Sequence, residues 1–253
     1  MENMNNFEPG ELNLNIIVEN SMKAIKQITG NLDHLNIAVL GKAGVGKSTL
    51  LNSVFRGELA KTGIGRPVTQ NIKKFSKEGL PFTIFDTPGL ELGEEQQKRV
   101  KSELIDIIEE NAANFDDAIH CIWYCVSALG SRIEDAELAL IRELTGETSN
   151  YNIPVIIVLT QSLNPENVRA LGTEIEKEKL DVAAIVPVLA QDYPVDEEYT
   201  KKAKGLEHLI EVMMDVLPER LQLTLQNLQK VSLRSKKNTL LLSLLQLLVQ
   251  LQR

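Results

Sequence analysis

The chain has 253 residues, enough for one sizeable core with an appendage or for two small domains. Its hydrophobic content of 43% and charged content of 25% are ordinary for a soluble globular protein. The net charge of −8 argues against a general nucleic-acid binder, because attraction to phosphate backbones needs a basic surface, so no DNA partner is expected. The charge is uneven, since residues 221–253 contain five basic side chains and no acidic one.

The start of the chain and the two cysteines indicate in which cellular compartment the protein is expected. Residues 1–10 lack the basic and apolar segments of a signal peptide. Cys121 and Cys125 lie four residues apart in an apolar run, where a strand would place them on one face and too far apart to bridge easily. Core packing in a reducing compartment fits them. The expected location is the cytoplasm, with peripheral membrane association as the alternative that the end of the chain raises.

Three regions follow one another along the chain. Residues 1–34 form a polar N-terminal segment with a helical pattern from Leu12 to Ile28. Residues 35–218 alternate between strand-like apolar runs and helical patterns. Strands are predicted at Leu35–Leu40, Pro81–Phe85, Ala118–Val126, Ile153–Leu159 and Ala183–Leu189, with a more polar edge strand at Ile72–Lys77. Helices are predicted near Lys47–Phe55, Glu94–Asn111, Arg132–Leu144, Pro165–Glu178 and Leu206–Val216. This alternation predicts an α/β three-layer sandwich with a mostly parallel six-stranded sheet.

Residues 219–253 form a basic tail rich in leucine and glutamine, which is predicted to be helical. Thr239, Ser243, Gln246 and Gln250 fall on one narrow helical stripe of an otherwise apolar run. Such a helix needs cover, either from a membrane or a helical partner through residues 221–253, or from its own domain. The pattern leaves these interpretations open.

The most specific motif is GKAGVGKST at residues 41–49, directly after a predicted strand and before a predicted helix. This is GxxxxGK[ST] in the setting where loop amides and a helix N-terminus bind phosphate. Lys47 is predicted to reach the terminal phosphates, and Ser48 to place its hydroxyl on Mg²⁺. The expected phosphate-binding residues are Gly41, Lys42, Ala43, Gly44, Val45, Gly46, Lys47, Ser48 and Thr49.

A second motif, FTIFDTPG at residues 82–89, follows one strand later. Asp86 lies at the end of that strand, where its carboxylate is suited to hold Mg²⁺. Gly89 supplies a backbone N–H that can closely approach the terminal phosphate.

These motifs, together with the loop GIGRPVTQ at residues 63–70 and the strand HCIWYCV followed by RIED, resemble the P-loop GTPases of the translation-factor-related class. The resemblance covers residues 35–216 and is closest to Era-like and YfjP-like GTPases, including their fungal relatives. It implies a G domain that uses GTP/GDP and Mg²⁺. It assigns Ser48, Thr69 and Asp86 to the metal, and catalysis to Lys47, Thr69 and Gly89, with two switch loops that could bind a second copy or an effector protein.

The chain departs from the family pattern beside the phosphates. Leu90 stands where Ras-like proteins place a water-orienting glutamine, which implies slow intrinsic hydrolysis. Gly44 stands where potassium-dependent relatives carry asparagine, so potassium dependence is not supported. Arg66 has the spacing to Thr69 of an arginine finger, and a solvated switch residue is the alternative.

The base-reading loop departs further. In the usual Asn/Thr-Lys-x-Asp motif the aspartate reads guanine, whereas here Thr160 and Gln161 are followed by Leu163, which has no acceptor. The side-chain amides of Gln161 and Asn164 are the candidate substitutes for that carboxylate, and the sequence does not choose between them. The backbone N–H of Ala190, in the loop after the last strand, is expected to meet the base oxygen.

The expected function is therefore a GTP-binding switch that hydrolyses GTP slowly. The alternatives are a nucleotide-regulated assembly or membrane module with little turnover, and a base-tolerant or ATP-preferring NTPase. Trp123, Tyr124 and His120 are interpreted as packing residues. The acidic residues at 134, 135 and 137 are interpreted as the first turn of a helix.

Overall fold

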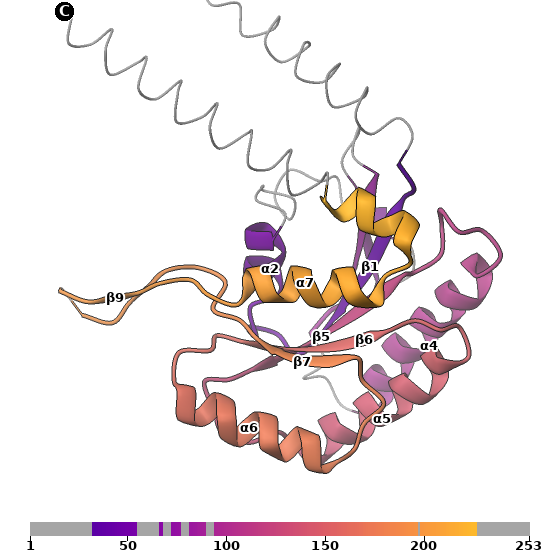
Figure 1. Ribbon diagram of the computed structural model, residues 1–253. Coiled ribbons are helices and arrows are strands. Elements are labelled where there is room, and N and C mark those ends of the chain that lie inside the picture. The colour runs from indigo at the N-terminus through magenta and orange to yellow at the C-terminus, as the bar shows by residue number, and fades with distance from the viewer. Residues whose placement is uncertain are drawn as a thin grey trace, which may run out of the picture.

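The computed structural model describes residues 32–54, 66–67, 72–76, 81–89, 94–196 and 198–226. Its centre is a seven-stranded sheet in the order β2-β3-β4-β1-β5-β6-β7 (Figure 1). β1, β4, β5, β6 and β7 pair in parallel, and β2 and β3 run antiparallel at one edge. The strands are β1 (Leu35–Leu40), β2 (Arg66–Pro67), β3 (Lys73–Ser76), β4 (Phe82–Asp86), β5 (Cys121–Ser127), β6 (Val155–Thr160) and β7 (Ala184–Pro187).

Helices cover both faces of the sheet (Figure 1). Buried side chains of α2 and α7 join one face of the central strands in one core cluster, and those of α4, α5 and α6 join the other face in a second cluster. The helices are α2 (Lys47–Val54), α4 (Glu94–Asn111), α5 (Asp135–Ser149), α6 (Pro165–Lys177) and α7 (Leu206–Val216). Since both faces are covered, every residue of β1 and β6 is buried, which explains their continuous apolar runs.

The predicted fold class is confirmed, because all six expected strands are present in a mostly parallel sheet with helices on both faces. The two-residue strand β2 is an addition that no alternation in the sequence indicated. Helix α5 begins at Asp135 rather than near Arg132, because Glu134 has extended backbone angles. Trp123 and Tyr124 are fully buried in opposite core clusters, so their interpretation as packing residues is confirmed.

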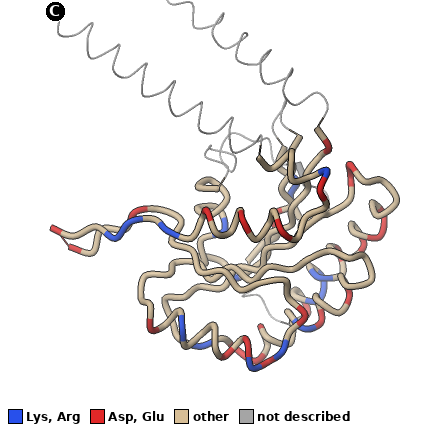
Figure 2. Tube along the Cα trace, viewed as in Figure 1, with Lys and Arg blue, Asp and Glu red and all other residues tan. Residues whose placement is uncertain are grey.

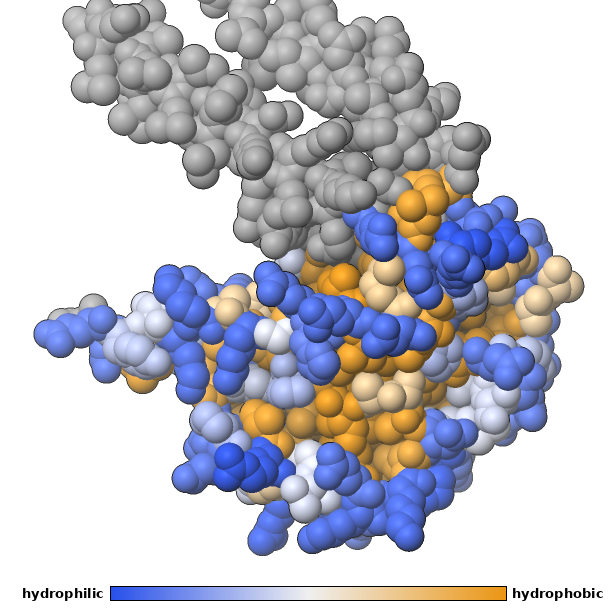
Figure 3. All heavy atoms as spheres, in the orientation of Figure 1, coloured by the Kyte–Doolittle hydropathy of each residue, from blue (hydrophilic) through white to orange (hydrophobic). Residues whose placement is uncertain are grey.

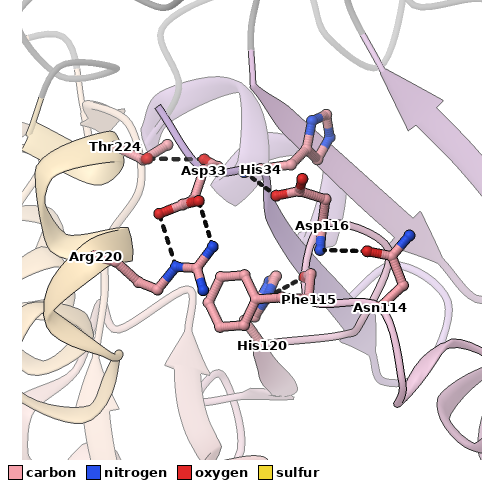
Figure 4. A network of polar contacts seen from close by, with 8 residues as sticks. All are labelled: Asp33, His34, Asn114, Phe115, Asp116, His120, Arg220 and Thr224. Carbon is pink, nitrogen blue, oxygen red and sulfur yellow. Dashed lines mark hydrogen bonds and ion pairs between the residues drawn. The ribbon is translucent and has the colours of Figure 1, made fainter. Parts of the chain in front are cut away.

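A further helix at 219–226 follows α7 and belongs to the same core, since Leu221, Thr224 and Leu225 are fully buried. It is also fixed to the residue two places before β1 (Figure 4). Arg220 donates from Nε to the Asp33 carboxylate at 2.8 Å and lies over the Phe115 ring, 3.6 Å from its centre. The Thr224 hydroxyl donates to the backbone carbonyl of Asp33 at 2.8 Å.

The expectations for the N-terminal helix and for residues 227–253 lie outside the described residues. Among the helices that the structure does describe, none combines the length and the apolar character needed to cross a membrane. Between β7 and α7 the chain forms a two-stranded antiparallel ribbon, β8 (Tyr193–Pro194) and β9 (Thr200–Lys201), which projects from the domain (Figure 1).

Candidate nucleotide-binding site

The phosphate loop joins β1 to α2 at the carboxyl end of the parallel strands, where ligands bind in sheets of this type. Gly41 has φ = 137°, and a Cβ atom there would lie 2.3 Å from the carbonyl oxygen of Cys125 on the neighbouring strand β5. No larger residue fits without displacing that strand. Gly46 has φ = 92°, which is also a conformation that L side chains rarely adopt. The backbone path of the loop therefore depends on its glycines.

Lys47 begins helix α2, and its side chain curls back over the loop. Its ammonium donates to the carbonyl oxygens of Gly41 at 2.7 Å and Lys42 at 3.0 Å. The positive charge is thus held inside the loop, where an anion would be bound. Ser48 is exposed in the first turn of the same helix, and Thr49 is half-buried. Ala43 and Gly44 at the tip of the loop are exposed, whereas Val45 is buried in the core.

Asp86 lies at the end of β4, beside β1. Burial raises the pKa of its carboxyl group, and the positive charges of Lys47 and Lys73 oppose that rise. Its Oδ1 atom is buried without a hydrogen-bond partner among the described residues. A buried carboxylate oxygen at the end of β4 and an exposed serine hydroxyl at the start of α2 are both hard oxygen donors of the kind that Mg²⁺ prefers. Ser48 and Asp86 therefore fit the metal that the motif implies.

The DTPG segment is attached to β1. The backbone N–H of Thr87 donates to Val39 O at 3.3 Å, and its hydroxyl lies 3.2 Å from the same oxygen. Gly89, two residues on, is half-buried. Of the other switch residues, Arg66 lies in β2 with its backbone paired to Lys74. Thr69 and Leu90 lie outside the described residues.

An acidic pair at the start of α5 contacts the phosphate loop, which the sequence pattern did not indicate. The Lys42 ammonium lies 2.8 Å from Glu134 Oε1 and 3.1 Å from Glu137 Oε2. Burial lowers the pKa of Lys42, but the two carboxylates outweigh it and the net shift is upward. Burial raises the pKa of Glu137, and Lys42 opposes that rise. Glu137 stands in the first turn of α5, as expected, whereas Glu134 lies one residue before the helix, and both bind the loop lysine. Glu134 and Glu137 reach Lys42 because β1, which precedes the phosphate loop, pairs with β5, which precedes α5.

The loop after β6 reaches the phosphate loop through two side chains. The Thr160 hydroxyl lies 2.5 Å from the carbonyl oxygen of Val45 and 3.1 Å from that of Val126. Gln161 Nε2 donates to Gly44 O at 3.2 Å, and its Oε1 accepts from Ser127 Oγ at 2.6 Å. The motifs at 41–49 and 160–161, far apart in the sequence, therefore form one site.

The remaining base-loop residues have other partners. Asn164 caps α6, and its side-chain oxygen accepts from the backbone N–H of Glu166 at 2.8 Å. The backbone N–H of Leu163 donates to Gln161 O at 2.6 Å, and its carbonyl accepts from the Lys201 ammonium on β9. Ala190 follows β7 and is half-buried.

This geometry is that of the P-loop class of folds: a phosphate loop between β1 and α2, a carboxylate with one buried oxygen at the end of β4, and a second loop held against the first. The comparison with protein families specifies the class further. Residues 36–161 match the family model described as "50S ribosome-binding GTPase", which supports a P-loop GTPase domain over that range.

The chain is similar to curated proteins from two GTPase groups. It is 26% identical over 216 residues to neuronal-specific septin-3 of Danio rerio, covering 75% of this chain and 57% of that protein. It is 26% identical over 187 residues to GTPase Era of Clostridium novyi (strain NT), covering 72% and 56%. The chain thus spans a little over half the length of these relatives. Septins and Era match at the same identity, so the comparison supports a GTPase domain without the narrower Era-like or YfjP-like assignment.

Among solved structures, Toc33 from Arabidopsis thaliana in complex with GDP and Mg²⁺ is 16% identical, with a TM-score of 0.45, covering 79% of this chain and 89% of that one. Era in complex with MgGDPNP and a 16S ribosomal RNA segment is 22% identical, with a TM-score of 0.43, covering 74% and 58%.

Proposed function

We propose that the protein binds GTP and GDP with Mg²⁺ and hydrolyses GTP slowly, acting as a nucleotide-dependent switch. The observation that carries this proposal is the buried, unpartnered Oδ1 of Asp86 beside a complete phosphate loop whose lysine charge is held inside the loop. A site for polyphosphate and a divalent cation explains both features.

Each residue has a role in this proposal. The loop amides and Lys47 neutralise the phosphates, and Ser48, Thr69 and Asp86 hold Mg²⁺, which when bound offsets negative charge on the phosphate oxygens. Thr69 and Gly89 sense the terminal phosphate, and their loops release when it is lost. Arg66 stabilises charge that develops on the γ-phosphate. Leu90 cannot orient the attacking water, so turnover is slow without an assisting partner.

The base-tolerant alternative has specific support. Gln161 is engaged at both ends of its amide, and Asn164 is engaged as a helix cap, so neither substitutes readily for the carboxylate missing at Leu163. The backbone N–H of Ala190 can donate to guanine O6, whereas adenine presents an amino donor there. One neutral hydrogen bond contributes about 0.5–1.5 kcal/mol, which corresponds to roughly a twofold to tenfold preference for GTP. We therefore expect weak base discrimination.

The test is equilibrium competition among GTP, GDP, ATP and ADP in the presence of Mg²⁺. A modest preference for the guanine nucleotides supports the proposal. Tighter binding of ATP than of GTP contradicts it. Lys47→Ala should abolish binding of all four, since it removes the phosphate-site charge. Turnover measured over a range of protein concentrations separates a switch from an assembly module, because the module binds GTP but hydrolyses almost none at any concentration.

A further inference from the structure

The β8–β9 ribbon begins beside the loop that is expected to meet the nucleotide base. Leu189 and Lys204 exchange two backbone hydrogen bonds of 2.9 Å, which fix the start of the ribbon to the end of β7. Tyr193 in β8 follows Ala190 closely in the chain, so their Cα atoms are about 11 Å apart at most. An aromatic side chain therefore stands near the place where the base is expected.

Tyr193 lies on the face of the ribbon that is turned toward the loop after β6. It pairs with Lys201 across the ribbon, and paired residues of antiparallel strands point to the same side. The Lys201 ammonium donates to the Leu163 carbonyl in that loop. Because the side chain of Lys201 reaches this loop, the face that it shares with Tyr193 is directed at the space between the loops after β6 and β7.

The ribbon holds Tyr193 on a defined frame. At the domain end, the Asp192 carboxylate pairs with the Lys202 ammonium at 2.8 Å and accepts from the Ala203 N–H at 2.8 Å. At the turn, the Asp196 carboxylate accepts from two backbone N–H groups at 2.9 and 2.7 Å. The backbone of Tyr193 is therefore fixed by contacts on both sides of it, although its side chain is exposed.

Tyr193 is accessible to a ligand, and the charges of the ribbon do not oppose an anionic one. The ribbon projects from the body of the domain (Figure 3), and Tyr193 is 46% exposed. The acidic residues Asp196 and Glu198 stand at the turn, which is the end of the ribbon away from the domain (Figure 2). At the domain end, the Asp192 carboxylate is offset by the Lys202 ammonium. A polyphosphate at the phosphate loop is therefore not repelled by the ribbon.

A nucleotide at the phosphate loop brings an aromatic ring of its own toward this space. The loop after β6 offers that ring few contacts, because Leu163 has no acceptor and the Gln161 amide is hydrogen-bonded to the protein at both ends. An aromatic side chain can stack on the face of a nucleobase, and such stacking tolerates any base because every base has a π-face. Tyr193 supplies an exposed ring for this contact.

From this placement we infer that the ring of Tyr193 stacks on the base of the bound nucleotide, with Lys201 directing the ribbon face toward it. The contact rests on the proposed function only in that a nucleotide occupies the phosphate loop, and it requires neither hydrolysis nor guanine. Stacking adds affinity without choosing between guanine and adenine. It therefore supplies binding energy at a site where weak base discrimination is expected.

The experiment is calorimetric titration of the full chain with GDP, ADP and inorganic tripolyphosphate in the presence of Mg²⁺. Tyr193→Ala should weaken the binding of GDP and ADP by the same factor, about fivefold or more, because it removes the stacked ring. Binding of tripolyphosphate, which has no base, should be unchanged. Tyr193→Phe keeps the ring and should bind both nucleotides as the wild type does. Circular dichroism of each variant checks that it is folded.

Tyr199→Ala is the matched control, because Tyr199 is 56% exposed on the same ribbon but stands at its turn, and all three affinities should be unchanged. Unchanged nucleotide affinity in Tyr193→Ala overturns the stacking contact and leaves the proposed function intact. An equal loss for tripolyphosphate also overturns it, since the substitution then acts on the phosphate loop. So does a loss confined to one base. Tighter binding of ADP than of GDP contradicts the proposed function instead, and a wild type that binds neither nucleotide overturns both.

Discussion

Gln161 joins the loop after β6 to the phosphate loop, since its Nε2 atom donates to the Gly44 carbonyl at 3.2 Å. Its φ of 53° turns the backbone so that the side chain reaches across, and its Cγ would lie 3.8 Å from a Cβ placed at Gly46. The aliphatic part of glutamine thus covers the phosphate loop. The amide that ends this side chain is occupied by the protein itself, which leaves base recognition without a carboxylate or a free amide from this loop.

Restoring the carboxylate should therefore restore base selectivity. Leu163→Asp places an acceptor for the N1 and N2 protons of guanine where the related motif has one, and we expect the ratio of GTP to ATP affinity to rise at least tenfold. Competition binding measures the ratio. Leu163→Asn is the matched control of similar shape without the charge, and its effect should be smaller. An unchanged ratio in Leu163→Asp would mean that the loop does not approach the base.

Lys42 should stabilise the fold mainly through Glu137. Lys42→Met leaves the buried Glu137 carboxylate without a counter-charge, and breaking a buried pair from one side costs roughly 3–5 kcal/mol. We expect a loss approaching that range in urea unfolding. Glu134→Gln should cost less than about 1 kcal/mol, because that carboxylate is exposed. Adding Glu137→Gln to Lys42→Met should recover most of the loss, and no recovery would show that Lys42 acts through other contacts.

Asp86 should determine how strongly Mg²⁺ improves nucleotide binding. Asp86→Asn removes the charge of the carboxylate, whose Oδ1 atom has no hydrogen-bond partner among the described residues, while keeping its size. We expect GTP affinity in EDTA to stay the same or to tighten, because a negative charge near the phosphates has gone. The gain in affinity on adding Mg²⁺ should fall at least tenfold. Titration with labelled GTP in both conditions measures the two quantities, and an undiminished Mg²⁺ effect would remove Asp86 from the metal site.

His120 should make the protein sensitive to acid. Burial lowers its pKa to about 4, from 6.5 in an unfolded chain. Its Nδ1 accepts from the Asn36 N–H at 3.0 Å, and its Nε2 bonds with Phe115 O at 2.9 Å (Figure 4 shows the Phe115 contact). Protonation of Nδ1 would replace that acceptor with a second donor. His120 was interpreted as structural from its isolation in sequence, and these contacts agree.

The sign of the pH effect follows from the lowered pKa. Between pH 6.5 and 4, His120 is protonated in the unfolded chain but stays neutral in the folded one. The free energy of unfolding therefore falls as the pH falls through this window. A shift of this size corresponds to about 3 kcal/mol. Urea unfolding at several pH values should show this slope, and His120→Gln should flatten it. A slope that persists in His120→Gln would assign the acid sensitivity to other groups, such as the half-buried His34.

The sequence predicted those parts of the molecule that depend on local pattern. The phosphate loop and the positions of the main strands and helices follow from motifs and apolar runs that act within a few residues. Contacts between distant segments were not predictable. Nothing near Glu137 in the sequence indicates Lys42, and nothing near Arg220 indicates Asp33, because only the assembled sheet brings these pairs together. Gln161 was recognised as unusual, but its two hydrogen bonds depend on the paths of three separate loops.

The helix at 219–226 belongs to the domain core, so the core should extend at least to residue 226. Leu221 and Leu225 are fully buried, so a truncation at residue 219 removes part of the core, whereas one after residue 226 removes none of the described residues. Leu221→Ala should cost roughly 2–5 kcal/mol, and Leu223→Ala, at an exposed position of the same helix, should cost little. Thermal unfolding measures both substitutions and both truncations.

We expect the chain that ends at residue 226 to unfold near the temperature of the full chain and to bind nucleotide equally well. The chain that ends at residue 218 should unfold at a much lower temperature, because it loses Leu221, Leu225 and the ion pair of Arg220 with Asp33. Equal stability of the two truncations would mean that helix 219–226 contributes nothing to the core. If the prediction holds, flotation with vesicles should compare the full chain with the chain ending at 226, because any difference then belongs to residues 227–253 alone.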